Sequence, residues 1–312
     1  MKKDKIVFMG TPDFASESLE KLYDSNFDIQ LVVTQADRRR GRGKKVKYPP
    51  VKSKALELGL KVHQPSDVNS DETIKMIEDI GPDFIVVVAF GQILKKELLS
   101  IAKYKCINVH ASLLPKYRGA APINWAIIDG EKQTGISIME MAEGLDTGDV
   151  LSKEAIPISE DDNYISLHDK LSKLGSKLLV QTIKDIKEGN YKREVQVEDL
   201  SSYASMLYKS TGRIDWNSKG EDILNLIRGL VPWPVAYSSY KGESFKIYKA
   251  EKVEKIEEAE PGTIVKVSDK AVFVNTKDST LKILELQFPN KRRMEAKDYL
   301  LGNDIEVGTV LS

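Results

Sequence analysis

Asn108 and His110 are the residues of this chain whose types and spacing point most directly to chemistry. They lie in the stretch CINVHASLLPKYRGAAP, residues 106–122, and the chain has only three histidines. Residues two apart on a β-strand point to the same side, so the amide and the imidazole would project together. An amide can donate a hydrogen bond to a developing oxyanion, and an imidazole can donate to it or move a proton. The pattern is typical of acyl-type transfer, and equally of two satisfied polar residues at a strand end.

Asp146 is a third candidate, in the stretch MEMAEGLDTGDV with a glycine on either side. A carboxylate there could orient the ring of His110, whereas an isolated aspartate in such a stretch is more often a turn residue. Both interpretations remain open on the sequence alone. The loop SLLPKYRGAAP adds Ser112 and an apolar run, which could line a pocket with apolar walls and a few polar groups.

The elements that must position these residues alternate between strands and helices in the first half of the chain. Strands are predicted at 5–10, 29–34, 60–64, 84–90 and 107–111. Helices are predicted at 11–25, 51–59, 70–80 and 120–130. In the first helix, Thr11 is the expected N-cap and Pro12 the expected first-turn residue. This alternation predicts a Rossmann-like parallel sheet with helices on both faces, which binds ligands at the carboxyl ends of its strands.

The pattern changes after a long amphipathic helix predicted at 167–189. A connector follows, and then short strands with polar turns, which are typical of a small OB-like β-barrel. We therefore expect a catalytic domain at 1–192, a linker at 193–206 and a C-terminal β-barrel domain at 207–312.

Composition narrows the class of protein. A chain of 312 residues with 41% hydrophobic and 30% charged residues is typical of globular domains. The longest apolar run, residues 84–90, is too short to span a bilayer, and the N-terminal stretch lacks a signal-peptide core. The single Cys106 excludes an internal disulfide framework and suits a cytoplasmic protein. No cluster has metal-ligand spacing, so no metal is expected.

Positive charge is concentrated in one segment although Lys plus Arg equals Asp plus Glu at 47 each. Seven of the ten residues of RRRGRGKKVK, positions 38–47, are basic. A bare charge run is usually a solvated loop. Here Gly41 and Gly43 would let the segment order against RNA, and it follows the predicted strand 29–34 on the ligand side of the sheet.

The sequence resembles the methionyl-tRNA formyltransferases over nearly the whole chain. The resemblance rests on residues 9–15, 32–52, 87–94, 106–122, 144–150, 213–216 and 232–234. The Asn-x-His, SLLPxYRGAAP and LDTGD elements mark the wider superfamily that uses 10-formyltetrahydrofolate, while the basic loop, RIDW and PWP indicate the tRNA-acting family. One departure is Ala111, where the family commonly has glycine.

The resemblance implies transfer of a formyl group from 10-formyltetrahydrofolate, a co-substrate, to the α-amino group of methionyl-tRNA. The product would be N-formylmethionyl-tRNA for translation initiation. Asn108, His110 and Asp146 are the implied catalytic residues, without a decision on the general base. The implied folate contacts are Ser112, Leu113, Leu114, Pro115, Phe90, Gly91, Ile93 and Leu94. The expected contacts to the initiator tRNA are Arg39, Arg40, Arg42, Lys44 and Lys45. Neither a membrane nor an obligate protein partner is expected.

Two alternatives remain in view. Another 10-formyltetrahydrofolate-dependent transferase, acting on a sugar nucleotide or purine precursor, would share Asn108, His110 and Asp146 but would not need the basic segment or the C-terminal barrel. A noncatalytic RNA-binding protein with a degenerate transferase domain would not need to keep these three residues, so their presence argues against it.

Overall fold

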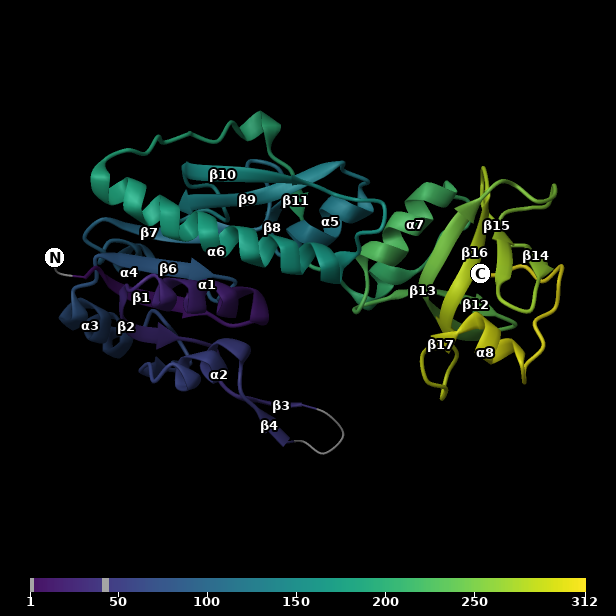
Figure 1. The fold of residues 1–312 in the computed structure, drawn as a ribbon, viewed down its shortest axis with the longest axis horizontal. Coiled ribbons are helices and arrows are strands. Elements are labelled where there is room, and N and C mark those ends of the chain that lie inside the picture. Colours follow the sequence, from purple (N-terminus) through teal and green to yellow (C-terminus); the bar gives the residue numbers. More distant parts are fainter. Residues whose placement is uncertain (1–2, 41–44) are drawn as a thin grey trace. The chain divides into compact units, whose positions relative to one another are not determined.

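The computed structural model describes residues 3–40 and 45–312. The chain forms two compact units (Figure 1), one built from 1–122, 134–156 and 168–204, the other from 123–133, 157–167 and 205–312. Each is described by itself. Within the described residues, no helix is long and apolar enough to cross a membrane.

A seven-stranded sheet in the order β10-β9-β7-β6-β1-β2-β5 forms the centre of the first unit. Its strands are β1 (Lys5–Gly10), β2 (Asp28–Val33), β5 (Val62–His63), β6 (Phe84–Val88), β7 (Lys105–His110), β9 (Gln133–Glu140) and β10 (Val150–Pro157). From β5 to β7 all neighbours are parallel. The predicted α/β fold class is confirmed. The sheet extends further than the sequence pattern indicated, because β9 runs antiparallel to β7 and β10 lies beside β9.

Helices cover both faces of this sheet, as predicted. They are α1 (Asp13–Asp24), α2 (Pro50–Glu57), α3 (Asp71–Ile80), α4 (Lys96–Leu99) and most of α6 (Tyr164–Glu188). On one face, Val7 and Val87 pack in a cluster with Ile77 of α3 and Leu98 of α4. On the other, α6 comes so close that a Cβ on Gly175 would lie 3.0 Å from Val109. Alternate residues of each central strand are therefore buried against opposite layers.

The predicted N-cap of the first helix is wrong. Helix α1 begins at Asp13, its N-cap residue is Pro12, and no side chain caps it. The hydroxyl of Thr11 instead donates to the carbonyl oxygen of Phe90 at 2.8 Å. It therefore joins the loops that follow β1 and β6 at the carboxyl edge of the sheet.

The basic segment forms a strand pair, β3 (Arg38–Arg40) and β4 (Lys45–Lys47), which pairs antiparallel and extends away from the sheet (Figure 1). Its base is fixed by polar contacts. Nζ of Lys52 lies 2.7 Å from Oδ2 of Asp37 and 2.7 Å from Oε1 of Gln64. The hydrogen bond from Lys52 holds the pKa of Asp37 below its usual value. The pair thus leaves the sheet after β2 from an ordered attachment.

The segment expected to be a linker carries structure in the first unit. It contains a 3₁₀ turn, η1 (Glu198–Leu200), and a short strand, β11 (Tyr203–Ala204). Strand β11 pairs in parallel with β8 (Arg118–Gly119). The chain after α6 is therefore hydrogen-bonded to the loop that follows His110.

The second unit is built on a six-stranded antiparallel sheet in the order β12-β13-β16-β15-β14, with β17 beside β16. Its strands are β12 (Ala236–Tyr240), β13 (Glu243–Val253), β14 (Ile264–Val267), β15 (Val272–Asn275), β16 (Thr280–Gln287) and β17 (Met294–Glu295). Helices α5 (Pro122–Ile128), α7 (Gly220–Gly229) and α8 (Ala296–Leu300) and a 3₁₀ turn, η2 (Lys209–Gly212), accompany it.

Register shifts between Ile247 and Ala250 bend β13, and the sheet curls around a core that includes Trp216 and Phe245. The prediction of a small C-terminal β domain of barrel type is confirmed, in the form of a curled, open sheet.

Candidate active site

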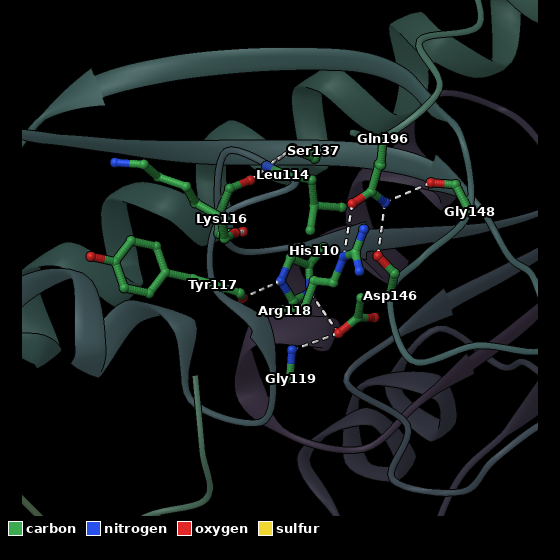
Figure 2. Close-up of polar contacts among 11 residues, drawn as sticks. His110, Leu114, Lys116, Tyr117, Arg118, Gly119, Ser137, Asp146, Gly148 and Gln196 are labelled. Atoms are coloured by element: carbon green, nitrogen blue, oxygen red, sulfur yellow. Dashed lines mark hydrogen bonds and ion pairs between the residues drawn. The ribbon is translucent and has the colours of Figure 1, made fainter. Parts of the chain in front are cut away.

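His110 ends strand β7 and is held at both ring nitrogens. Its Nε2 atom lies 2.9 Å from the carbonyl oxygen of Tyr117, and its Nδ1 atom lies 3.6 Å from Oδ2 of Asp146 (Figure 2). A carbonyl oxygen only accepts hydrogen bonds, so Nε2 carries the hydrogen. In the neutral ring, Nδ1 is then the unprotonated nitrogen that faces the carboxylate. The ring can therefore gain or lose a proton at Nδ1 without breaking its contact to Tyr117.

Asp146 lies in the loop between β9 and β10, with its backbone in the left-handed region at φ 52°. Its Oδ2 atom accepts a hydrogen bond of 2.8 Å from the backbone N–H of Gly119. The side chains of His110 and Asp146 are only 7% and 15% exposed, so water screens their interaction weakly. The structure thus brings together two residues that are 36 positions apart in the sequence.

Asn108 shares the face of β7 on which His110 lies, because the two residues are two apart on the strand. Asn108 is half-buried, and its amide forms no hydrogen bond with any side chain or backbone group that the structure describes. An unengaged amide beside a buried imidazole can donate to a substrate oxygen on which negative charge develops. The amide and the imidazole therefore lie on one face of β7, as the sequence predicted.

Cys106 lies on the same strand but has no nucleophilic character. It is buried, and burial raises the pKa of its thiol above the ordinary value of 9.0. The uncharged thiol packs in the apolar cluster that also contains Leu98. This matches the expectation of a small core residue.

The loop after His110 is ordered by hydrogen bonds that use Ser112 internally. The hydroxyl of Ser112 donates to the carbonyl oxygen of Lys116 at 2.6 Å. Ser137 of β9 donates to the carbonyl oxygen of Ser112 at 2.7 Å and accepts from the N–H of Leu114 at 3.0 Å. Leu114 packs against Met139 and Val150. In this stretch the hydroxyl of Ser112 shapes the loop, and Leu113 and Pro115, both half-buried, complete it.

The predicted folate-contact residues after β6 fall into two groups, one buried and one exposed. Phe90 and Leu94 are buried in the same cluster that Met141, at the start of the Asp146 loop, packs against. Gly91 is exposed at φ 86°, and the side chain of Ile93 is 80% exposed. Phe90 and Leu94 therefore anchor this loop, while Gly91 and Ile93 present backbone and apolar surface beside the segment that carries Asp146.

The predicted tRNA contacts lie on the strand pair that follows β2. Arg39 and Arg40 are in β3 and Lys45 is in β4, whereas Arg42 and Lys44 lie outside the described residues. Because β2, β1, β6 and β7 are parallel, β2 ends at the same sheet edge as β7. The expectation that the basic segment leaves the sheet on the side of His110 is confirmed.

Several residues around the pair of His110 and Asp146, called the dyad below, were not singled out from the sequence. Gln196 donates through Nε2 to the carbonyl oxygens of Asp146 at 2.8 Å and of Gly148 at 2.7 Å (Figure 2). Its Oε1 atom accepts from Nε of the buried Arg118 at 3.0 Å. Arg118 and Gly119 belong to the quoted motif and could have been included with it. Gln196 lies in a stretch with no periodicity or motif to mark it.

The chain matches the family described as Formyl transferase over residues 4–183 and the family described as Formyl transferase, C-terminal domain over residues 206–304. It therefore belongs to the formyl transferase family.

Its relatives define the branch of that family. The methionyl-tRNA formyltransferase of Clostridium acetobutylicum is 52% identical, over 98% of this chain and 99% of that protein. The methionyl-tRNA formyltransferase of Caldanaerobacter subterraneus subsp. tengcongensis is 50% identical, again over 98% of this chain and 99% of that protein. The resemblance to the methionyl-tRNA formyltransferases is thereby confirmed.

More distant crystal structures have the same fold. WlaRD, a sugar 3N-formyl transferase, matches with a TM-score of 0.69 at 21% identity, covering 94% of this chain and 100% of that one. HypX from Aquifex aeolicus in complex with tetrahydrofolic acid matches with a TM-score of 0.63 at 19% identity, covering 99% of this chain and 51% of that one. At these identities the likeness concerns the fold alone.

Proposed function

We propose that this protein transfers the formyl group of 10-formyltetrahydrofolate to the α-amino group of methionyl-tRNA, giving N-formylmethionyl-tRNA for translation initiation. The observation that carries the proposal is identity of about half the residues, over nearly the whole chain, to proteins named methionyl-tRNA formyltransferase. Support from the site comes from the contact between His110 and Asp146, which suits a proton-moving dyad rather than a degenerate domain. The proposal places the enzyme in the cytoplasm.

The reaction needs charge stabilisation and proton movement. A bond forms between the α-amino nitrogen and the formyl carbon, and the bond from that carbon to the folate nitrogen breaks. One proton leaves the amine and one arrives on the folate nitrogen. We assign Asn108 to donate to the formyl oxygen as its negative charge develops, and Nδ1 of His110 to take and return the proton. Asp146 would stabilise the protonated ring, because its carboxylate faces that nitrogen.

The residues near the dyad suit a folate co-substrate. A pterin ring and its side arm need apolar walls with a few polar groups at fixed places. The candidates are the loop Ser112–Pro115 and residues Phe90, Gly91, Ile93 and Leu94. Phe90 and Leu94 are buried in the cluster that Met141 packs against, whereas the side chain of Ile93 is exposed. Among the residues that the structure describes, no group of three or more His, Cys, Asp or Glu could hold a metal ion.

The basic strand pair is our candidate for contact with the tRNA. Arg39, Arg40, Arg42, Lys44 and Lys45 concentrate positive charge in a segment that leaves the sheet at the edge where His110 lies. Phosphate contacts of this kind position a nucleic acid without reading its sequence. The second unit, matched by the C-terminal family domain over residues 206–304, would assist in tRNA binding. The catalytic assignment covers 1–192 together with 193–204 of the expected linker, which belong to the first unit.

The test is transfer of labelled formyl from 10-formyltetrahydrofolate to several acceptors. We expect rapid labelling of initiator methionyl-tRNA and little labelling of free methionine or of an amino-sugar nucleotide. Preference for the amino-sugar nucleotide would instead identify a sugar-acting transferase of the same family. Tight tRNA binding without transfer to any acceptor would identify a noncatalytic RNA-binding protein. Either outcome would overturn the proposal.

A further inference from the structure

The backbone from Tyr117 to Gly119 contacts both members of the dyad. The carbonyl oxygen of Tyr117 lies 2.9 Å from Nε2 of His110, and the N–H of Gly119 donates to Oδ2 of Asp146 at 2.8 Å. A shift of this short strand would therefore move the imidazole and the carboxylate relative to each other. The geometry of the site therefore depends on the contacts that hold this strand in place.

The chain after α6 holds one side of this strand. The N–H of Arg118 donates to the carbonyl oxygen of Ser202 at 2.8 Å, and the N–H of Tyr117 donates to the hydroxyl of Ser202 at 2.9 Å. The approach at Gly119 is tight, because a Cβ there would lie 2.8 Å from the carbonyl oxygen of Ala204, and its φ of 111° favours glycine. These contacts fix the strand but do not reach the loop that carries Asp146.

Gln196 connects that loop to Arg118. Its amide nitrogen donates to the carbonyl oxygens of Asp146 and Gly148, and its amide oxygen accepts from Nε of Arg118. Only one orientation of the amide satisfies all three contacts, since carbonyl oxygens only accept and a guanidinium only donates. The residue next to Arg118 is Gly119, whose N–H holds the carboxylate of Asp146. Gln196 thus fixes the backbone of Asp146 relative to the group that orients its side chain.

Apolar packing does not explain why Gln196 lies there. From Lys192 to Leu200 every residue is exposed except Gln196, which is half-buried. Its neighbours Val195 and Val197 are 71% and 55% exposed. The loop itself is open as well, with Leu145 55% exposed. Hydrogen bonds rather than a hydrophobic core therefore determine the position of this part of the site.

We infer that Gln196 is a positioning residue for the dyad of His110 and Asp146, acting through the two backbone carbonyls that its amide holds. The inference rests on the proposed function and extends it to a residue in the segment after α6. The hydrogen bonds of the Gln196 amide go to Arg118 and to the backbone of Asp146 and Gly148, and none goes to the imidazole or the carboxylate. The three hydrogen bonds of the Gln196 amide are called the clamp below. Displacement of a catalytic group by about 1 Å can lower turnover on the order of 100-fold, so the loss of the clamp should have a measurable effect.

Two substitutions separate the functions of the amide. Gln196→Met keeps the length of the side chain and removes all three hydrogen bonds. Gln196→Glu keeps an acceptor for Arg118 but places an oxygen where the two carbonyl oxygens need a donor. For both variants we expect kcat for formylation of methionyl-tRNA to fall about 10- to 100-fold, with KM for tRNA and for folate changed less than about 3-fold. Wild-type turnover in Gln196→Glu would overturn the inference, because the donated bonds would then be unimportant.

Coupling to Asp146 distinguishes positioning from a general loss of stability. In the Asp146→Ala background, measured by single-turnover transfer of labelled formyl, Gln196→Met should cost little further activity. An equal loss in both backgrounds would overturn the inference. The matched control is Gln181→Met, the same change on α6, where the glutamine donates to Asp185 at 2.8 Å. This control should keep wild-type kcat.

Amide hydrogen exchange provides a readout that does not depend on activity. In Gln196→Met, exchange should become faster at Gly119 and in residues 144–148, while β6 should remain protected. Unchanged exchange at both places would also overturn the inference. If the wild-type enzyme transfers no formyl group to methionyl-tRNA, while Gln196→Met shows the expected change in exchange, the proposed function is refuted and the positioning by Gln196 is supported.

Discussion

Nε2 of His110 is hydrogen-bonded to the carbonyl oxygen of Tyr117, and this contact decides which ring nitrogen faces Asp146. Because the carbonyl oxygen accepts, Nε2 carries the hydrogen, and Nδ1 is the ring nitrogen that faces the carboxylate. The backbone carbonyl group of Tyr117 thereby determines the tautomer of His110. In many other histidine–carboxylate pairs, the carboxylate has this function. In the proposed reaction, the function of the carboxylate is to stabilise the protonated ring.

We predict that His110 and Asp146 act as one unit. His110→Ala and Asp146→Ala should each lower kcat strongly, on the order of 100-fold or more. The double variant should be scarcely slower than the poorer single variant, since residues that act together give non-additive losses. Steady-state kinetics of the three variants at one saturating folate concentration measure this. Losses that multiply fully would show that the two residues act independently.

We predict that Asn108 serves the reaction rather than the fold. Asn108→Ala should lower kcat on the order of 100-fold, with a nearly unchanged midpoint of thermal unfolding, because no described residue uses its amide. A matched comparison is Asn124→Ala, in which a buried amide that donates to Gly229 at 2.7 Å is lost. That variant should unfold at a clearly lower temperature. Normal turnover of Asn108→Ala would exclude a catalytic function for this amide.

We predict that Arg42 contacts tRNA phosphate or the acceptor end, although it lies outside the described residues. Arg42→Ala should weaken formylation of methionyl-tRNA and leave folate binding unchanged. Loss of one phosphate contact should reduce the slope of log affinity against log salt by roughly 0.7 to 0.9 for all tRNAs alike. Loss of a base or end-specific contact should instead change the preference between initiator and other tRNAs. Unchanged tRNA kinetics at every salt concentration would mean that this segment is a solvated surface loop.

We predict that His63 makes the fold less stable in mild acid. Burial lowers the pKa of His63 from its ordinary value of 6.5, and Nε2 of its ring lies 3.0 Å from the hydroxyl of Thr73. The unfolded chain therefore binds this proton more tightly. The resulting loss of stability is absent above about pH 6.5, begins as pH falls through that value and is complete below the folded-state pKa.

Thermal unfolding of wild type and His63→Gln at about pH 7.5 and about pH 5 measures this effect. The variant should lose less stability than wild type over that interval. His168→Gln is the control, because that imidazole lies 3.6 Å from the carboxylate of Asp13 and its removal should not reduce the loss. An equal loss in wild type and His63→Gln would contradict the prediction.

Local chemistry was enough to predict the parallel strands of the central sheet and most of the helices of the first unit, but not β9 and β10. The apolar run Phe84–Val88 is a strand buried along its whole length, and helix α3 begins after Ser70, whose hydroxyl caps it, and ends at Gly81. The pairing of Asn108 with His110 also follows from the sequence, since the strand period of two is a property of the extended backbone. Thr11 shows the limit, because the expected helix cap was replaced by a hydrogen bond to a loop 79 residues away.

Only the tertiary structure decided how the site is held together. Local periodicity does not reveal that His110 lies 3.6 Å from Asp146. It also does not reveal that Gln196 is hydrogen-bonded to a loop 50 residues earlier in the chain. Strand β9 likewise lies antiparallel to β7, and the local sequence of neither strand determines that direction. Periodicity reports which face of an element is buried. Contacts between distant residues depend on which elements pack together, and that choice is made by the free energy of the whole fold.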